Sequence, residues 1–172
     1  MPCNVQLRRA DLAHRVAAAG PRLAIGDEAY LGELPDGVPY MTLSEVADVL
    51  DEDLPQDAPV EHADLAPDDP AVIIFTSGTT GEPRGVVYAQ RYLMGQRLQA
   101  EHWFGARDGE LAWCTAATGW SKSTRNVFIA PWLSGATALL HEGRFDPTER
   151  LAIAEREGVN VLCQAPTEYR MI

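Results

Sequence analysis

The chain has 172 residues, of which 46% are hydrophobic, so it can bury one sizeable core and form one ordinary domain. Twenty-five acidic residues against fourteen basic ones give a net charge of −11, which argues against a nucleic-acid-binding surface. No apolar run reaches the roughly 18 residues of a membrane span, and the first residues do not resemble a signal peptide.

The N-terminal part predicts two helices separated by a short strand. Residues 7–19 have the apolar spacing of an amphipathic helix, and residues 23–25 form an apolar run that predicts a strand. Thr42 and Glu45 have the spacing of a capping box, which predicts a second helix after them. We expect residues 1–50 to be the end of a preceding α/β subdomain.

An acidic, proline-rich stretch follows. Residues 51–70 contain eight acidic residues and four prolines, a composition typical of a solvated linker or surface excursion. The alternative interpretation is an acidic segment that binds a partner.

The most informative stretch is a loop rich in hydroxyl groups and glycines, between apolar runs at 71–75 and 86–88 that predict strands. Its glycines allow a close backbone approach to a ligand, and successive N–H groups in such a turn can bind an anion. The hydroxyls add donors and the arginine adds a fixed positive charge. We therefore predict a phosphate-binding loop made of Thr76, Ser77, Gly78, Thr79, Thr80, Gly81, Glu82, Pro83, Arg84 and Gly85.

This loop is not of the Walker type. Gly78 and Gly81 are too close together, and Arg84-Gly85 replaces the Gly-Lys-Ser/Thr ending at the start of a helix. A glycine-rich hairpin loop without a ligand is the alternative, and the ordered combination of hydroxyls, glycines, proline and arginine disfavours it.

Beyond the loop, predicted helices and strands alternate. A helix of about a dozen residues starts at Gln90, and Asp146-Pro147 opens a second with Glu149 at its third position. This alternation favours βαβ units around a largely parallel sheet, hence an α/β fold, with the phosphate loop's two strands as the exception. The remaining predicted elements are a strand at 110–115, a helix at 121–133 disturbed by Pro131, and strands at 137–141 and 160–164.

The ten-residue loop resembles the signature of the adenylate-forming superfamily, Thr-Ser-Gly-Thr-Thr-Gly-x-Pro-Lys-Gly, with Arg84 in place of the usual lysine. Arginine keeps the charge but presents a planar fork rather than a point charge. The resemblance implies a partial N-terminal domain of an adenylate-forming enzyme, in which the loop closes over the β- and γ-phosphates of ATP. Residues 71–172 would then be an AMP-binding α/β subdomain that is truncated at its C-terminus.

Three further segments are similar to blocks of medium-chain acyl-CoA synthetases, namely 113–123, 128–136 and 163–172. The resemblance places Gly119, Trp120, Thr167 and Tyr169 on the acyl and CoA side of the cleft. A core tryptophan and a plain helix N-terminus are the alternatives for Trp120 and for the Thr167 segment. Ala117 departs from the family, where an aspartate is frequent, and this leaves the acyl chain length open.

The resemblance implies a fragment of an ATP-dependent acyl-CoA synthetase. Such an enzyme activates a carboxylic acid, here a medium- or short-chain fatty acid, as an acyl-adenylate and transfers it to CoA, using ATP and Mg²⁺. The blocks that bind Mg²⁺ and the ribose are absent from this chain, so we predict no metal site in it and no turnover by it alone. The alternatives are a truncated pseudo-enzyme and a subunit that completes its site with a partner chain.

The cysteines and histidines show no metal-binding spacing. Cys114 and Cys163 lie in apolar runs and predict buried thiols, which favours a reducing, cytoplasmic location. The four histidines are interpreted as surface or helix-end residues. Lys122 is interpreted as an exposed residue at a helix start, and the packing residues are expected to include Trp103, Trp113 and Trp132.

Overall fold

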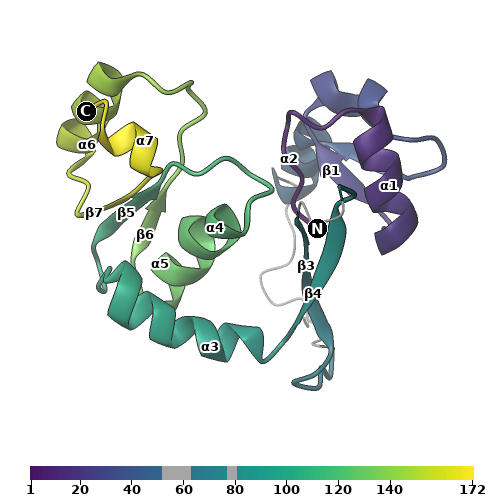
Figure 1. Cartoon of the computed structure of the whole chain (residues 1–172), viewed down its shortest axis with the longest axis horizontal. Coiled ribbons are helices and arrows are strands. Elements are labelled where there is room, and N and C mark those ends of the chain that lie inside the picture. Colours follow the sequence, from purple (N-terminus) through teal and green to yellow (C-terminus); the bar gives the residue numbers. More distant parts are fainter. Residues whose placement is uncertain (52–62, 77–80) are drawn as a thin grey trace.

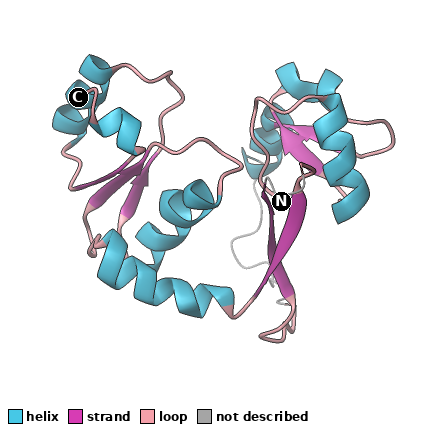
Figure 2. Cartoon of the chain, viewed as in Figure 1, coloured by secondary structure: helices cyan, strands magenta, loops and turns pink. Residues whose placement is uncertain are grey.

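The computed structural model describes residues 1–51, 63–76 and 81–172 of the chain. It is a mixed α/β structure whose strands form three small sheets in this described part (Figures 1 and 2). The α/β class and the alternation of helices and strands predicted from the sequence are confirmed. The strands divide into a parallel pair, an antiparallel hairpin and a parallel three-stranded sheet.

The N-terminal part contains the two predicted helices and the predicted strand. Two of its elements were not predicted: a 3-10 helix at Glu28–Glu33, and strand β2, which pairs in parallel with β1. The other bounds in this part are α1 Arg9–Ala19, β1 Ala24–Gly26, β2 Tyr40–Thr42 and α2 Leu43–Asp51.

The capping box at the start of α2 forms as predicted. The Glu45 backbone N–H donates to Thr42 Oγ1 over 3.1 Å, and Glu45 Oε2 accepts from the Thr42 backbone N–H over 2.6 Å. The hydrogen bonds from the Thr42 backbone and side chain lower the pKa of the Glu45 carboxyl. Thr42 and Glu45 therefore satisfy each other's backbone N–H groups. Because these residues are only three positions apart, the helix start could be located from the sequence alone.

Strands β3 (Pro70–Thr76) and β4 (Arg84–Ala89) form an antiparallel hairpin with one register irregularity near Pro70. Because side chains alternate along a strand, Thr76 and Arg84 face one side and Phe75 and Gly85 the other. The hairpin carries the predicted phosphate loop at its turn. It is the antiparallel exception that the sequence predicted.

The C-terminal part is a parallel sheet of order β6-β5-β7 with helices on both faces (Figure 1). The chain runs from the central strand to one edge and then crosses to the other edge, so two crossovers of the same hand lie on opposite faces. Its elements are α3 Tyr92–Gln99, β5 Leu111–Cys114, α4 Ser121–Ser123, α5 Ala130–Leu133, β6 Thr137–Leu139, α6 Pro147–Glu157, β7 Val161–Cys163 and α7 Pro166–Tyr169.

The core lies mainly on one face of this sheet. Ala112 and Cys114 of β5 pack there against Ala130 of α5, which has no exposed surface. Trp113 points to the other face, where Arg150 of α6 lies 4.6 Å from its ring centroid. The buried residues of the core cluster are Ala100, Phe104, Ala106, Ala112, Cys114, Ala130, Ala136 and Cys163.

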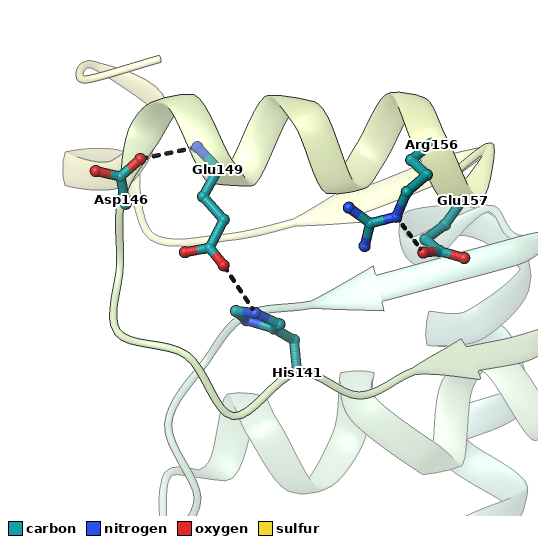
Figure 3. Close-up of polar contacts among 5 residues, drawn as sticks. All are labelled: His141, Asp146, Glu149, Arg156 and Glu157. Atoms are coloured by element: carbon teal, nitrogen blue, oxygen red, sulfur yellow. Dashed lines mark hydrogen bonds and ion pairs between the residues drawn. The ribbon is translucent and has the colours of Figure 1, made fainter.

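Helix α6 begins as predicted, with Asp146 as its N-cap and Pro147 in the first turn. The Glu149 backbone N–H donates to Asp146 Oδ1 over 2.8 Å, as Figure 3 shows. The Glu149 carboxylate reaches His141 Nε2 at 3.5 Å and ties the end of the β6 segment to α6. At the other end of α6, Arg156 pairs with Glu157 over 2.8 Å.

The helical stretch predicted at 121–133 forms and, as predicted, it is disturbed next to Pro131. A π-helical segment at Thr124–Ile129 directly precedes α5, in which Pro131 lies. Proline has no backbone N–H to donate, so it interrupts the regular pairing of a continuous helical stretch. One other expectation fails. Trp103 and Trp132 are 63% and 65% exposed, so the expectation that they pack in the core is wrong.

In the described part of the chain, no helix combines the length and the hydropathy needed to cross a bilayer.

The contrast between two tryptophans gives a test of where the core lies. Trp113→Ala should lower the free energy of unfolding by about 3–5 kcal/mol, because Trp113 is 1% exposed and packs against Arg150 and His141. Trp103→Ala, which removes an equally large but exposed ring, should change it by no more than about 0.5 kcal/mol. Urea denaturation of both variants measures the difference. Equal losses would contradict the assigned core.

Candidate functional site

The structure describes the second half of the predicted phosphate loop, from Gly81 to Gly85. Gly81 has φ of +93°, a backbone conformation that favours glycine, and Arg84 follows as an exposed residue in register with Thr76. The hairpin therefore brings Thr76 and Arg84 onto the same side. Four predicted loop residues lie outside the described part: Ser77, Gly78, Thr79 and Thr80.

Gly85 has a packing role in the hairpin. A Cβ at this position would lie 3.2 Å from Phe75 Cζ and 3.3 Å from Ile73 Cγ2. These contacts are tighter than usual for a Cβ, and the Phe75 ring covers the glycine on the paired strand. The glycine therefore lets the aromatic ring lie flat across the base of the loop.

Helix α1 packs against this base through two side chains. His14 Nε2 lies 2.8 Å from the carbonyl oxygen of Pro83, and the Arg15 guanidinium lies 5.1 Å from the Phe75 ring centroid. One helix thus contacts both legs of the hairpin. These contacts could not be predicted from local patterns, because His14 and Pro83 are far apart in the chain, and His14 was interpreted as a surface or helix-end residue.

A second group of predicted residues lies at the carboxyl edge of the three-stranded sheet. The chain leaves β5 toward α4 on one face and leaves β7 toward α7, which contacts α6 on the other face. Adjacent strands whose following segments diverge in this way form a crevice at their carboxyl ends, and ligands of open α/β sheets bind there. We call the edge formed by residues 115–122 and 164–169 the crevice.

Polar contacts hold the two sides of the crevice together. Lys122 Nζ donates to the carbonyl oxygen of Gln164 over 2.6 Å, so Lys122 is not the free surface residue that the sequence predicted. Thr115 Oγ1 donates to Glu168 Oε2 over 2.6 Å, and the Ala165 N–H donates to the same carboxylate oxygen over 3.0 Å. These contacts join the segment after β5 to the segment after β7.

Behind these contacts lies a buried guanidinium. Arg150 is 6% exposed, stacks on Trp113, and places Nη2 4.0 Å from Glu168 Oε1. The Gln164 side chain is 2% exposed, and neither its oxygen nor its nitrogen has a hydrogen-bond partner among the described residues. Buried amides are normally hydrogen-bonded, so this side chain is an exception among the buried polar groups of the described residues.

The crevice contains all four residues predicted for the acyl and CoA side. Trp120 is 66% exposed at the start of α4, so its alternative interpretation as a core residue is wrong. Tyr169 donates its hydroxyl to the carbonyl oxygen of Leu162, and burial raises the pKa of that hydroxyl. Thr167 is exposed in the first turn of α7, and Gly119 precedes Trp120. The hydrogen bonds of the described residues do not join this group to Arg84, and Figure 1 shows the hairpin apart from the parallel sheet.

No cluster of three or more histidine, cysteine or acidic side chains suited to a metal ion occurs in the described ranges.

Gly119 touches the N-terminal segment. Its φ is +86°, and a Cβ there would lie 2.6 Å from the backbone nitrogen of Asn4 and 3.0 Å from the carbonyl carbon of Cys3. Real Cβ atoms do not approach backbone so closely, so only glycine fits without a shift of one segment. The residue is therefore required for the shape of the crevice whatever it contacts in a ligand.

This requirement is testable with a glycine pair. Gly119→Ala should lower the free energy of unfolding by about 1–3 kcal/mol because of the positive φ and the contact with Asn4. Gly95→Ala, in the open face of α3 with no atom within 4 Å of the new Cβ, should instead raise it by roughly 0.5–1 kcal/mol. Denaturant unfolding of both variants measures these changes. The free energy of unfolding should fall in Gly119→Ala and rise in Gly95→Ala.

The sequence matches the AMP-binding enzyme family over residues 1–172. It is 33% identical to an uncharacterized acyl-CoA ligase of Bacillus subtilis, YtcI, over all of this chain and 34% of that protein. It is 39% identical to the acetyl-coenzyme A synthetase of the same organism, over 57% of this chain and 17% of that protein.

Solved structures of the same kind superpose on the chain. A Brucella canis acyl-CoA synthetase matches 99% of it with a TM-score of 0.84 and 25% identity, over 33% of the larger chain. The anthranilate CoA ligase AuaEII, solved with anthranoyl-AMP, matches 97% with a TM-score of 0.81 and 22% identity, over 34% of its chain. The chain therefore spans about a third of the length of these relatives. It belongs to the AMP-binding enzyme family and has the fold of part of the N-terminal domain of adenylate-forming enzymes.

Proposed function

We propose that this chain supplies the phosphate-binding hairpin and one wall of the acyl cleft to an ATP-dependent acyl-CoA synthetase. The observation that carries the proposal is the family match over residues 1–172, together with the hairpin that brings Thr76 and Arg84 to one side of the loop. The substrates would be ATP, CoA and a small carboxylic acid, with Mg²⁺ as the metal that accompanies ATP. The relative named acetyl-coenzyme A synthetase supports a short-chain acid. The resemblance of the segments after the loop to medium-chain acyl-CoA synthetases supports a medium-chain fatty acid as the alternative.

In this proposal the hairpin stabilises charge that develops on the leaving pyrophosphate. Attack of the carboxylate on the α-phosphorus of ATP releases pyrophosphate, and positive groups and hydroxyls aimed at that charge lower the barrier. Arg84 would contribute the positive charge, and Thr76 with the loop hydroxyls would contribute hydrogen bonds. The Arg84 side chain is exposed and faces away from α1, so a polyphosphate can reach it.

The crevice would hold the acyl and CoA side. Trp120 would contribute an exposed apolar ring to this side. In the second step the CoA thiol displaces AMP from the acyl-adenylate. The residues of this wall would position the thiol and the acyl group for that displacement. We also propose that residues 1–50, 51–70 and 71–172 are the structural subdivisions of the chain. We further propose a cytoplasmic location for the protein, because its three cysteines are free thiols in this structure.

The role of Arg84 can be tested in the complete gene product, with acid-dependent exchange of pyrophosphate into ATP as the readout. Arg84→Ala should lower the exchange rate by about a hundredfold or more, because a group that stabilises transition-state charge is lost. Arg84→Lys should restore most of the rate, since the family's usual residue there is lysine. Arg91→Ala, which removes an exposed arginine paired with Asp68 after β4, should leave the rate unchanged. Equal effects of the Arg84 and Arg91 variants would contradict the proposal.

The purified 172-residue chain should show no acid-dependent exchange of pyrophosphate into ATP. Several groups of the proposed site lie outside it, and losses of single groups in such sites already cost orders of magnitude in rate. Measurable exchange by this chain, free of any longer species by intact mass, would contradict the expectation. Adding a separately purified partner chain that restores exchange would favour the alternative of a site completed between two chains.

A further inference from the structure

Two buried cysteines lie directly opposite one another at the carboxyl ends of neighbouring strands. Cys114 of β5 pairs in register with Cys163 of β7, and the residues are 7% and 8% exposed. Paired residues of adjacent strands point to the same face, and their strands lie about 4.8 Å apart. That separation falls within the Cα spacing of about 4.4–6.8 Å that a disulfide requires.

The surroundings of Cys163 differ from those of an inert core thiol. Asn126, itself 2% exposed, points its amide Nδ2 at Cys163 Sγ from 3.6 Å. Lys122 lies on the same side of the sheet end, where its ammonium group bonds the carbonyl oxygen of the next residue, Gln164. A donor and a positive charge thus converge on one sulfur, and such surroundings favour a thiolate.

The ionisation of the two thiols follows from this arrangement. The hydrogen bond from Cys114 lowers the pKa of Cys163, against the opposing effect of burial, and Lys122 and Asn126 add to the decrease. The same hydrogen bond and burial raise the pKa of Cys114. Besides the two thiols, the titratable groups that act on the pair are Lys122 on α4 and Tyr169 on α7.

We propose that Cys163 and Cys114 form a peroxide-reactive thiol pair in which Cys163 is the attacking thiolate and Cys114 the resolving thiol. In the first step the Cys163 sulfur attacks one peroxide oxygen, the O–O bond breaks, and the released hydroxide takes up a proton to form water. Cys163 is oxidised to a sulfenic acid and the peroxide is reduced. In the second step the Cys114 sulfur attacks Cys163, the S–O bond breaks, and a second water leaves with the Cys114 proton.

The product would be a disulfide across the base of the crevice. Cys114 precedes Thr115 and Cys163 precedes Gln164, the residues whose polar contacts connect the two sides of the crevice. A covalent link there would fix the spacing of the two strand ends.

The test uses the reduced chain, hydrogen peroxide and intact-mass measurement under native conditions. The expected product is a chain that has lost two hydrogens, with a peptide map that joins Cys114 to Cys163 and recovery of the original mass on reduction. Cys3→Ser is the matched control and should form the same product, because burial raises the pKa of Cys3 and no second cysteine is paired with it. The reaction rate should rise with pH as the Cys163 thiolate forms, and it should do so at lower pH than for an ordinary thiol, because the pKa of Cys163 is lowered.

A second variant separates the two steps. In Cys114→Ser the sulfenic acid on Cys163 cannot be resolved, so peroxide should add one oxygen atom, and a cyclic diketone reagent should trap it at Cys163. The proposal is overturned if the native chain gains oxygens at Cys3 before the two paired cysteines react, or if the disulfide forms only in denaturant. None of these readouts depends on ATP or an acid, so the outcome is independent of the proposed function.

Discussion

The structure depends on the position of β5 between two parallel neighbours. Its backbone bonds to β6 on one edge and to β7 on the other, so it has no free edge and both of its faces are covered. Ala112 and Cys114 are small enough for α5 to approach one face, and Trp113 fills the other against Arg150. The crevice exists because the chain leaves β5 and β7, neighbours in this sheet, toward opposite faces.

Local sequence patterns were sufficient for most helix starts and strands. The Thr42–Glu45 box and the Asp146 cap depend on residues three positions apart, so their hydrogen bonds could be predicted without knowledge of the fold. Strand β2 was missed because three residues, one of them threonine, carry too little periodicity to distinguish a strand from a loop. The π-helical segment before Pro131 has no simple pattern in sequence.

Contacts between distant residues could not be predicted in the same way. The exposure of Trp103 and Trp132 depends on which helix faces find a partner, and aromatic character alone does not decide that. The pairing of Cys114 with Cys163 requires the strand order, since β6 lies between them in sequence but not in the sheet. Both thiols were correctly expected to be buried, but their register and the approach of Asn126 became visible only in three dimensions.

The N-terminal segment supports both groups of predicted site residues. Asn4 lies against Gly119 at the crevice, and His14 and Arg15 of α1 hold the two legs of the hairpin. Since an α-helix rises only 1.5 Å per residue, the stretch from Asn4 to Arg15 is a short and partly rigid connection between these contacts. Among the described residues, no hydrogen bond joins the hairpin directly to the crevice. The stretch from Asn4 to Arg15 contacts both of them. In this arrangement α1 is part of the support of the site, although none of its side chains belongs to the family's loop.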